Sequence, residues 1–145
     1  MAEAVFRALT KQEELEGYFH VDSAGIGDWH IGKPPHEGTR KRLEQASISH
    51  EGMLARQVHE QDWEKYDYII AMDEQNLSDL SMIKKEAGHV KVARLLDFVD
   101  HPDVKNIPDP YFTNNFDYVF ELIEKGCKGL FNQLKASHNL YSRSE

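Results

Sequence analysis

The chain has 145 residues, a net charge of −8 from 25 acidic and 17 basic side chains, and a single cysteine. That acidic balance argues against a general affinity for nucleic acid or for an anionic membrane surface. No apolar run is long enough for a transmembrane helix, and the first residues lack the pattern of a signal peptide. One cysteine cannot form an internal disulfide, which is typical of a protein in the reducing cytoplasm. We therefore expect one cytoplasmic domain over residues 1–145.

The first half of the chain predicts a helix, a strand and a second helix. Apolar residues recur at helical spacing in MAEAVFRAL, so a helix is expected from Met1. The stretch YFHVD predicts a short strand over Tyr18–Asp22, followed by a loop of small residues. Pro34 and Pro35 suit the start of a helix, which is expected over Pro35–Ala46.

The second half predicts strands alternating with helices. After a short helical turn in DWEK, the unalternating apolar run Tyr68–Met72 is typical of a parallel strand covered on both faces. LSDLSMIKKEA predicts a helix, and HVKVARLLDFV predicts a mainly extended segment. An apolar stripe through FDYVFELIEKGCKGLFNQLKASHN, which includes Cys127, predicts a long amphipathic helix.

This alternation indicates an α/β fold, in which parallel strands are joined by right-handed crossovers. Ligands of such sheets bind beyond the carboxyl ends of the strands. The predicted strands are followed by the polar stretches DSAG, MDEQN and DFVD, and Asp109 in IPDPYF comes after the last of them. We therefore expect a binding site at this edge of the sheet.

Six blocks carry a resemblance to a known family: MAEAVFR, DSAGIGDWHIGKPPHEGT, GMLARQVHEQD, YDYIIAMDEQNLSDL, RLLDFV and IPDPYFTNNFDYVFELIEKGC. In this order they resemble the bacterial branch of the low-molecular-weight protein tyrosine phosphatases, over essentially the whole chain. The resemblance implies a Rossmann-like parallel sheet, of the phosphotyrosine protein phosphatase I-like fold, with helices on both faces. It also implies hydrolysis of phosphotyrosine in proteins or of small phosphomonoesters, without a metal or organic cofactor. Phosphoarginine stays open as an alternative substrate.

The resemblance also implies roles for particular residues. Asp109 would be the general acid, which protonates the leaving group and then activates water against a cysteinyl-phosphate. Tyr111 and Phe112 would form an aromatic wall for the substrate, and Trp29 would form the opposite lip. Ser23 would support the phosphate loop by hydrogen bonding. The family aspartate at Asp73 is expected to be structural.

One departure from the family is large. Its members have a strand and a Cys-x5-Arg-Ser/Thr loop before the block that opens here at Met1, and this sequence holds neither. The resemblance therefore leads us to expect an N-terminally truncated domain that is inactive as written and marginal in stability. Cys127 lies on the apolar stripe of a helix and is expected to be an inert packing residue rather than a substitute nucleophile.

Three other interpretations can be weighed against this one. The chain could be a non-catalytic pseudophosphatase or short form that binds a partner, or a second copy of itself, through an open sheet edge. An arsenate reductase is disfavoured, because that chemistry needs additional cysteines. The eight histidines do not show the i, i+4 spacing of a zinc pair, so we expect them to be surface residues and expect no metal site.

Overall fold

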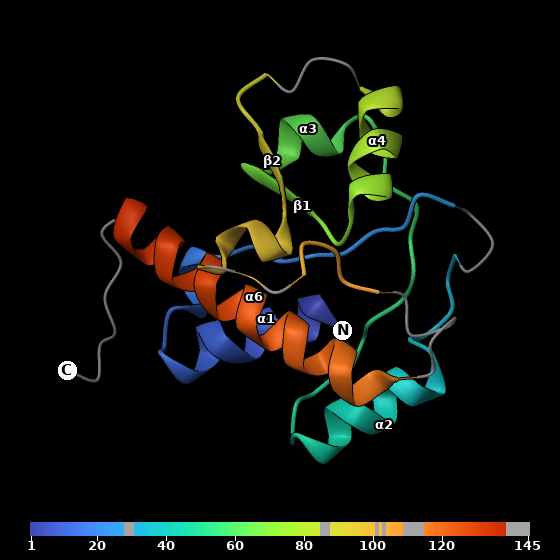
Figure 1. Ribbon diagram of the computed structural model, residues 1–145, viewed down its shortest axis with the longest axis vertical. Coiled ribbons are helices and arrows are strands. Elements are labelled where there is room, and N and C mark those ends of the chain that lie inside the picture. Colours follow the sequence, from blue (N-terminus) through green and yellow to red (C-terminus); the bar gives the residue numbers. More distant parts are fainter. Residues whose placement is uncertain (28–30, 85–87, 101, 103, 109–114, 139–145) are drawn as a thin grey trace.

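The computed structural model describes residues 1–27, 31–84, 88–100, 102, 104–108 and 115–138 (Figure 1). The elements are α1 (Ala2–Gln12), the 3-10 helix η1 (Glu16–Tyr18), α2 (Glu37–Gln45), α3 (Asp62–Lys65), β1 (Tyr68–Ala71), α4 (Glu74–Ile83), β2 (Lys91–Arg94), the 3-10 helix η2 (Leu95–Phe98) and α6 (Phe116–Ser137). From α3 onward helices and strands alternate, as predicted, whereas no strand is assigned before β1 in the described residues. No helix in these residues is long and apolar enough to cross a membrane.

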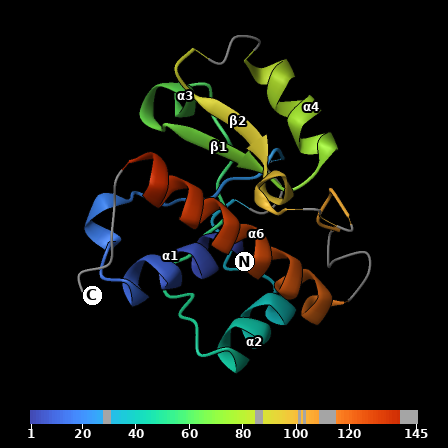
Figure 2. The same cartoon turned by 60° about the vertical axis from the view of Figure 1, so that its left-hand side comes forward.

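Strands β1 and β2 pair in parallel, with Tyr68 opposite Lys91. Successive side chains of β1 alternate between two apolar clusters, because a strand presents its residues to opposite faces. Tyr68 and Ile70 pack against a large cluster that includes α1 and α6, whereas Ile69 and Ala71 pack with residues of α3 and α4. Figure 2 shows helices on both sides of the pair. The prediction of a parallel strand covered on both faces is thus confirmed.

The larger cluster joins α1 to α6. The rings of Phe6, Phe19 and Phe131 contact one another edge to face, with centroids 5.6 to 5.8 Å apart. The predicted amphipathic stripe of the long helix is confirmed. The buried residues of α6 are Val119, Phe120, Ile123, Gly126, Cys127, Leu130, Phe131 and Leu134.

The predicted strand over Tyr18–Asp22 is wrong in this structure. Tyr18 ends η1, and no strand is assigned between it and β1 in the residues that the structure describes. The backbone at Phe19 is extended, with φ −126° and ψ 134°, but the carbonyl of Val21 accepts a hydrogen bond from Arg7 Nη2 at 2.7 Å instead of from a strand. An extended segment becomes a strand only when a neighbour offers a ladder of backbone groups, and no described residue offers one here.

The extended segment expected in HVKVARLLDFV is only partly confirmed. Lys91–Arg94 form β2, but Leu95–Phe98 turn into η2. Asp97 causes the change locally, because its Oδ2 accepts a hydrogen bond from the Arg94 backbone N–H at 2.9 Å and its Oδ1 accepts one from Arg94 Nη2 at 3.2 Å. Side chains that bond nearby backbone groups compete with strand pairing in this way.

Gly129 lies where α6 passes closest to η2. A Cβ at this position would overlap the backbone carbonyl of Phe98, which cannot rotate away as a side chain can. We expect Gly129→Ala to lower the free energy of unfolding by about 1–3 kcal/mol, because overpacking outweighs the gain of about 1 kcal/mol in helix propensity. Chemical denaturation measures the change. Gly17→Ala, in open space, is the matched control; an equal effect of the two substitutions would contradict the prediction.

Candidate active site

The carboxyl end of β1 is held in place by hydrogen bonds from the chain that follows it. Asp73 caps α4, since its Oδ1 accepts a hydrogen bond from the backbone N–H of Asn76 at 2.7 Å. The side chain of Asn76 returns to β1, where its Oδ1 accepts from the Met72 N–H at 3.3 Å. This geometry agrees with a structural role for Asp73.

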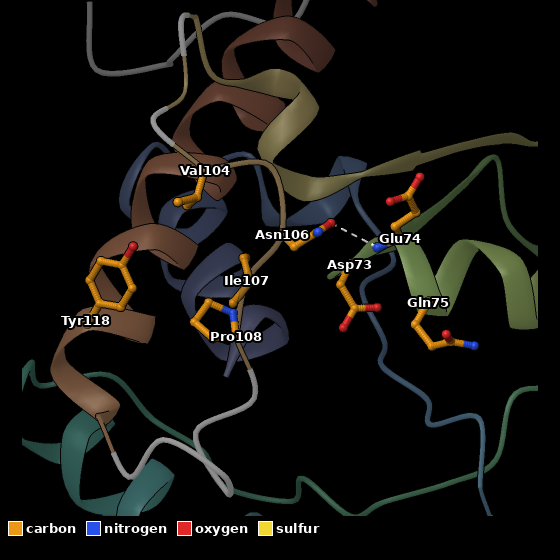
Figure 3. A pocket seen from close by; sticks show the side chains of 8 residues that line it. All are labelled: Asp73, Glu74, Gln75, Val104, Asn106, Ile107, Pro108 and Tyr118. Atoms are coloured by element: carbon orange, nitrogen blue, oxygen red, sulfur yellow. Dashed lines mark hydrogen bonds between the residues drawn. The ribbon is translucent and has the colours of Figure 1, made fainter.

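A later segment is attached to the same edge. The backbone N–H of Ile107 donates to the Met72 carbonyl at 2.9 Å, and the Ile107 side chain is buried. Asn106 Oδ1 accepts from the Glu74 N–H at 3.0 Å, a bond drawn in Figure 3. The residues immediately before Asp109 are therefore anchored at the edge of the sheet where the sequence predicted a site.

A pocket of about 420 Å³ opens beside this anchor. Figure 3 shows Pro108 between the Tyr118 ring, which comes from α6, and the carboxylate of Asp73. The pocket thus combines an apolar side with a polar one, one residue away from Asp109 along the chain. Its lining residues are Asp73, Glu74, Gln75, Val104, Asn106, Ile107, Pro108 and Tyr118.

Most of the predicted site residues are not among the residues that the structure describes. Trp29, Asp109, Tyr111 and Phe112 lie outside the described residues, and their roles stay predictions. Of the predicted set, the structure describes Ser23.

Ser23 belongs to a network that sequence reasoning missed. Its hydroxyl donates to Glu3 Oε1 at 2.7 Å, and Arg7 Nη1 lies 2.9 Å from Glu3 Oε2. The Glu3 side chain is only 5% exposed, so these two contacts offset the cost of burying its polar group. The spacing of Glu3 and Arg7 four residues apart on a helix was the available sequence signal. The predicted support of a phosphate loop by Ser23 stays a prediction.

Arg56 ties the loop next to Ser23 to α3. Its Nε lies 2.9 Å from Asp22 Oδ2, and its Nη1 lies 3.1 Å from Asp62 Oδ2. The Tyr66 hydroxyl also donates to Asp22 Oδ2, at 3.3 Å. One arginine held by two carboxylates braces the loop that follows η1, and an isolated parallel bridge between Gly25 and Gln57 holds the same loop further along.

The pKa values of three groups in this cluster are shifted. Partial burial alone would lower the pKa of Arg56, but its hydrogen bonds to Asp62 and Asp22 outweigh burial and raise it. Partial burial alone would raise the pKa of Asp22, but hydrogen bonds from the Ser23 N–H and Arg56, with the Arg56 charge, outweigh burial and hold it below its usual value. Burial and the neighbouring Asp22 charge raise the pKa of Tyr66. Asp22 therefore stays ionised at neutral pH and keeps Arg56 in place.

Cys127 is buried within the larger apolar cluster, 1% exposed, and its Sγ lies 3.8 Å from the Ala2 carbonyl. Burial, together with the charge of Glu124, raises the pKa of the Cys127 thiol to about 12. A thiol needs a lowered pKa and access to substrate in order to act as a nucleophile. The structure therefore places Cys127 as a packing residue. Across the described residues, no group of three His, Cys, Asp or Glu side chains could hold a metal ion.

Comparisons with known proteins agree on one family. The model of the low molecular weight phosphotyrosine protein phosphatases matches residues 1–140. The low molecular weight protein-tyrosine-phosphatase YfkJ of Bacillus subtilis is 50% identical over 142 residues, which cover 97% of this chain and 90% of YfkJ. Its crystal structure superimposes with a TM-score of 0.90 at 49% identity, over 94% of this chain and 86% of that one.

A second solved structure extends the likeness beyond bacteria. The Drosophila arginine phosphatase DARP has a TM-score of 0.82 at 27% identity, and the match covers 92% of this chain and 88% of DARP. The fold, the matched span and the identity to YfkJ lead to one conclusion. The chain belongs to the low molecular weight phosphotyrosine protein phosphatases, a family of hydrolases.

Proposed function

We propose that this chain supplies the acid side of a phosphatase site, with Asp109 as the general acid. The observation that supports this most strongly is the family match over residues 1–140, a span that includes the sequence Asp-Pro-Tyr at residues 109–111. The anchoring of Ile107 and Asn106 at the end of β1 agrees with it, because the general acid of a parallel α/β enzyme belongs at that edge.

In the proposed reaction, a cysteine thiolate attacks phosphorus and the bond from phosphorus to the leaving oxygen breaks. Asp109 donates its proton to that oxygen. Asp109 then takes a proton from water, whose oxygen attacks phosphorus, so that the sulfur–phosphorus bond breaks and inorganic phosphate leaves. Tyr111, Phe112 and Trp29 would line the substrate, and Ser23 would support the phosphate loop. We expect the reaction in the reducing cytoplasm, without a cofactor.

The 145 residues hold one cysteine, Cys127, which is unsuited to this attack because it is buried and its pKa is raised. We therefore propose that they do not turn over substrate by themselves. The substrate is a phosphorylated protein or a small phosphomonoester. The name of YfkJ, a protein-tyrosine-phosphatase, favours phosphotyrosine, and the name of DARP, an arginine phosphatase, keeps phosphoarginine as the alternative.

A second candidate function, partner binding through a sheet edge, is favoured by the open side of β1. The Lys91 N–H donates to the Asp67 carbonyl. In a parallel pair, alternate residues of a strand bond to the same neighbour, so the backbone N–H and C=O groups of Tyr68 and Ile70 point away from β2. No described strand pairs with them on that side. Unpaired edges of this kind attract another strand.

One comparison tests both candidates. The completed chain, as we define it, carries a designed segment before Met1 that adds one strand and a Cys-x5-Arg-Ser loop. We expect the completed chain to be a monomer that hydrolyses p-nitrophenyl phosphate and a phosphotyrosine peptide. The 145 residues alone should be inactive and should associate in sedimentation velocity. Replacing the added cysteine by serine is the control for turnover.

Two results would count against these proposals. Robust hydrolysis of a phosphotyrosine peptide by the 145 residues alone would contradict the need for an added nucleophile. A sharp monomer with cooperative melting would contradict the open edge. Parallel assays with phosphotyrosine and phosphoarginine decide between the two substrates.

A further inference from the structure

The first turn of α6 packs against the start of α2 through an aromatic ring. Phe116 is the first residue of α6 and follows residues 109–114 closely in the chain. Its ring lies nearly parallel to the ring of His36, with centroids 5.5 Å apart and an angle of 8°. A Cβ on Gly38 would overlap the Phe116 ring, and Gly38 does not have a positive φ. Glycine is therefore needed at this position for space, not for backbone conformation.

A second contact holds the same two helices together one turn further along. The Nε of Arg42 lies 2.8 Å from Asp117 Oδ1, without the alignment of a hydrogen bond, so the contact is an ion pair. The Arg42 guanidinium also lies 4.1 Å from the centroid of the Phe120 ring. The position of the α6 N-terminus relative to α2 is thus fixed by both a close-packed ring and a charged contact.

The other end of the same segment is anchored elsewhere. The Ile107 N–H bonds to the Met72 carbonyl at the end of β1, 2.9 Å away. In the sequence, Asp109 therefore lies between two anchored residues, Ile107 on the sheet and Phe116 on α2. A displacement of Phe116 changes the distance that the chain between these two anchors has to span.

We infer that Gly38 and His36 are positioning residues for Asp109, because both pack against Phe116, the residue that anchors the chain after Asp109. The inference rests on the proposed role of Asp109 as general acid. It concerns residues of α2 and its N-cap, which carry no other role in the reaction. Displacements of about 1 Å at a reacting group can lower the rate by up to about 100-fold. The packing of Phe116 against Gly38 and His36 is therefore expected to affect the rate of turnover. The alternative is that these contacts of Phe116 only stabilise the packing of α2 on α6.

The first test uses the 145-residue chain itself and does not depend on turnover. Hydrogen–deuterium exchange is measured at the amides of residues 111–115 in Gly38→Ala and in Gly17→Ala. Gly17 is the matched control, since a Cβ there meets no atom within 4 Å. We expect exchange about fivefold or more faster in Gly38→Ala only. The double variant Gly38→Ala, Phe116→Leu makes room for the added methyl group and should recover part of the difference. Equal exchange in the two alanine variants would overturn the inference.

The second test separates positioning from packing, using the completed chain. A displaced acid slows a poor leaving group more than a good one, because the good one needs less protonation. We expect Gly38→Ala to lower kcat/KM for phenyl phosphate at least about tenfold more than kcat/KM for 2,4-dinitrophenyl phosphate, because kcat/KM excludes the later attack of water. His36 caps α2, since its Nδ1 accepts a hydrogen bond from the Gly38 N–H at 3.0 Å. His36→Asn replaces that acceptor by an amide oxygen and removes the stacked ring, and it should act in the same direction if Gly38→Ala does not fold.

Equal losses of kcat/KM with the two substrates, or no loss, would overturn the inference. The proposed function fails separately, by its own variant. If Asp109→Asn lowers turnover and Gly38→Ala does not change the leaving-group dependence, only the positioning role is wrong. If Asp109→Asn has no effect, the assignment of the acid is wrong.

Discussion

Asp109→Asn in the completed chain is expected to lower kcat/KM for phenyl phosphate by about 100- to 1,000-fold, the usual contribution of a general acid. Asparagine keeps the size and hydrogen-bonding capacity of the side chain but has no proton to give to the leaving oxygen. The effect should shrink for 2,4-dinitrophenyl phosphate, whose leaving group departs without protonation. Steady-state kinetics with the two substrates measures the difference. Binding should change little, so that KM stays within a few-fold.

The control for charge is Asp100→Asn, because Asp100 is an exposed aspartate in the same region of the chain. It removes one carboxylate outside the sequence between Ile107 and Phe116, and it should leave both rates unchanged. A loss in kcat/KM for Asp109→Asn that is equal with the two substrates would assign the carboxylate to something other than proton transfer to the leaving oxygen, because kcat/KM does not include the later attack of water.

The long helices and the buried strand could be predicted because each has a pattern that is local in the sequence. The apolar stripe of α6 and the unbroken apolar run of β1 are examples, and both are confirmed. The failed strand over Tyr18–Asp22 shows the limit of this reasoning. Its residue types favour an extended backbone, and Phe19 has one, but a strand also requires a neighbour that no local pattern can supply.

The place of the candidate site was predicted from the strand pattern, whereas the roles of its residues were predicted from the family resemblance. The edge of the sheet could be expected from polar loops after strands, and the anchoring of Ile107 at Met72 agrees with it. The contacts that brace the site are long-range in sequence. Ser23 meets Glu3, and Gly38 meets Phe116, so their pairing depends on the packing of α1 and α6. Spacing along the chain carries no signal for such pairs.

Cys127 should be almost unreactive in the folded chain. At about pH 8, a pKa of about 12 instead of the ordinary 9.0 leaves about a thousandfold less thiolate. Burial of the sulfur, in a residue that is 1% exposed, also excludes the reagent. We expect alkylation by iodoacetamide to be at least about a thousandfold slower in the folded protein than in denaturant. Mass spectrometry of quenched samples measures both rates.

The same pKa shift links Cys127 to stability. Because the folded pKa is raised, the neutral thiol contributes fully below about pH 9 and its contribution falls as pH rises towards 12, by about 4 kcal/mol in all. Cys127→Ala should therefore show a flatter loss of stability above about pH 9, in urea denaturation at a series of pH values.

In the completed chain the same substitution should leave kcat unchanged, because the attacking sulfur would belong to the added loop. Fast alkylation of the folded chain, or a large fall in kcat for Cys127→Ala at unchanged stability, would instead give this buried thiol a part in the chemistry.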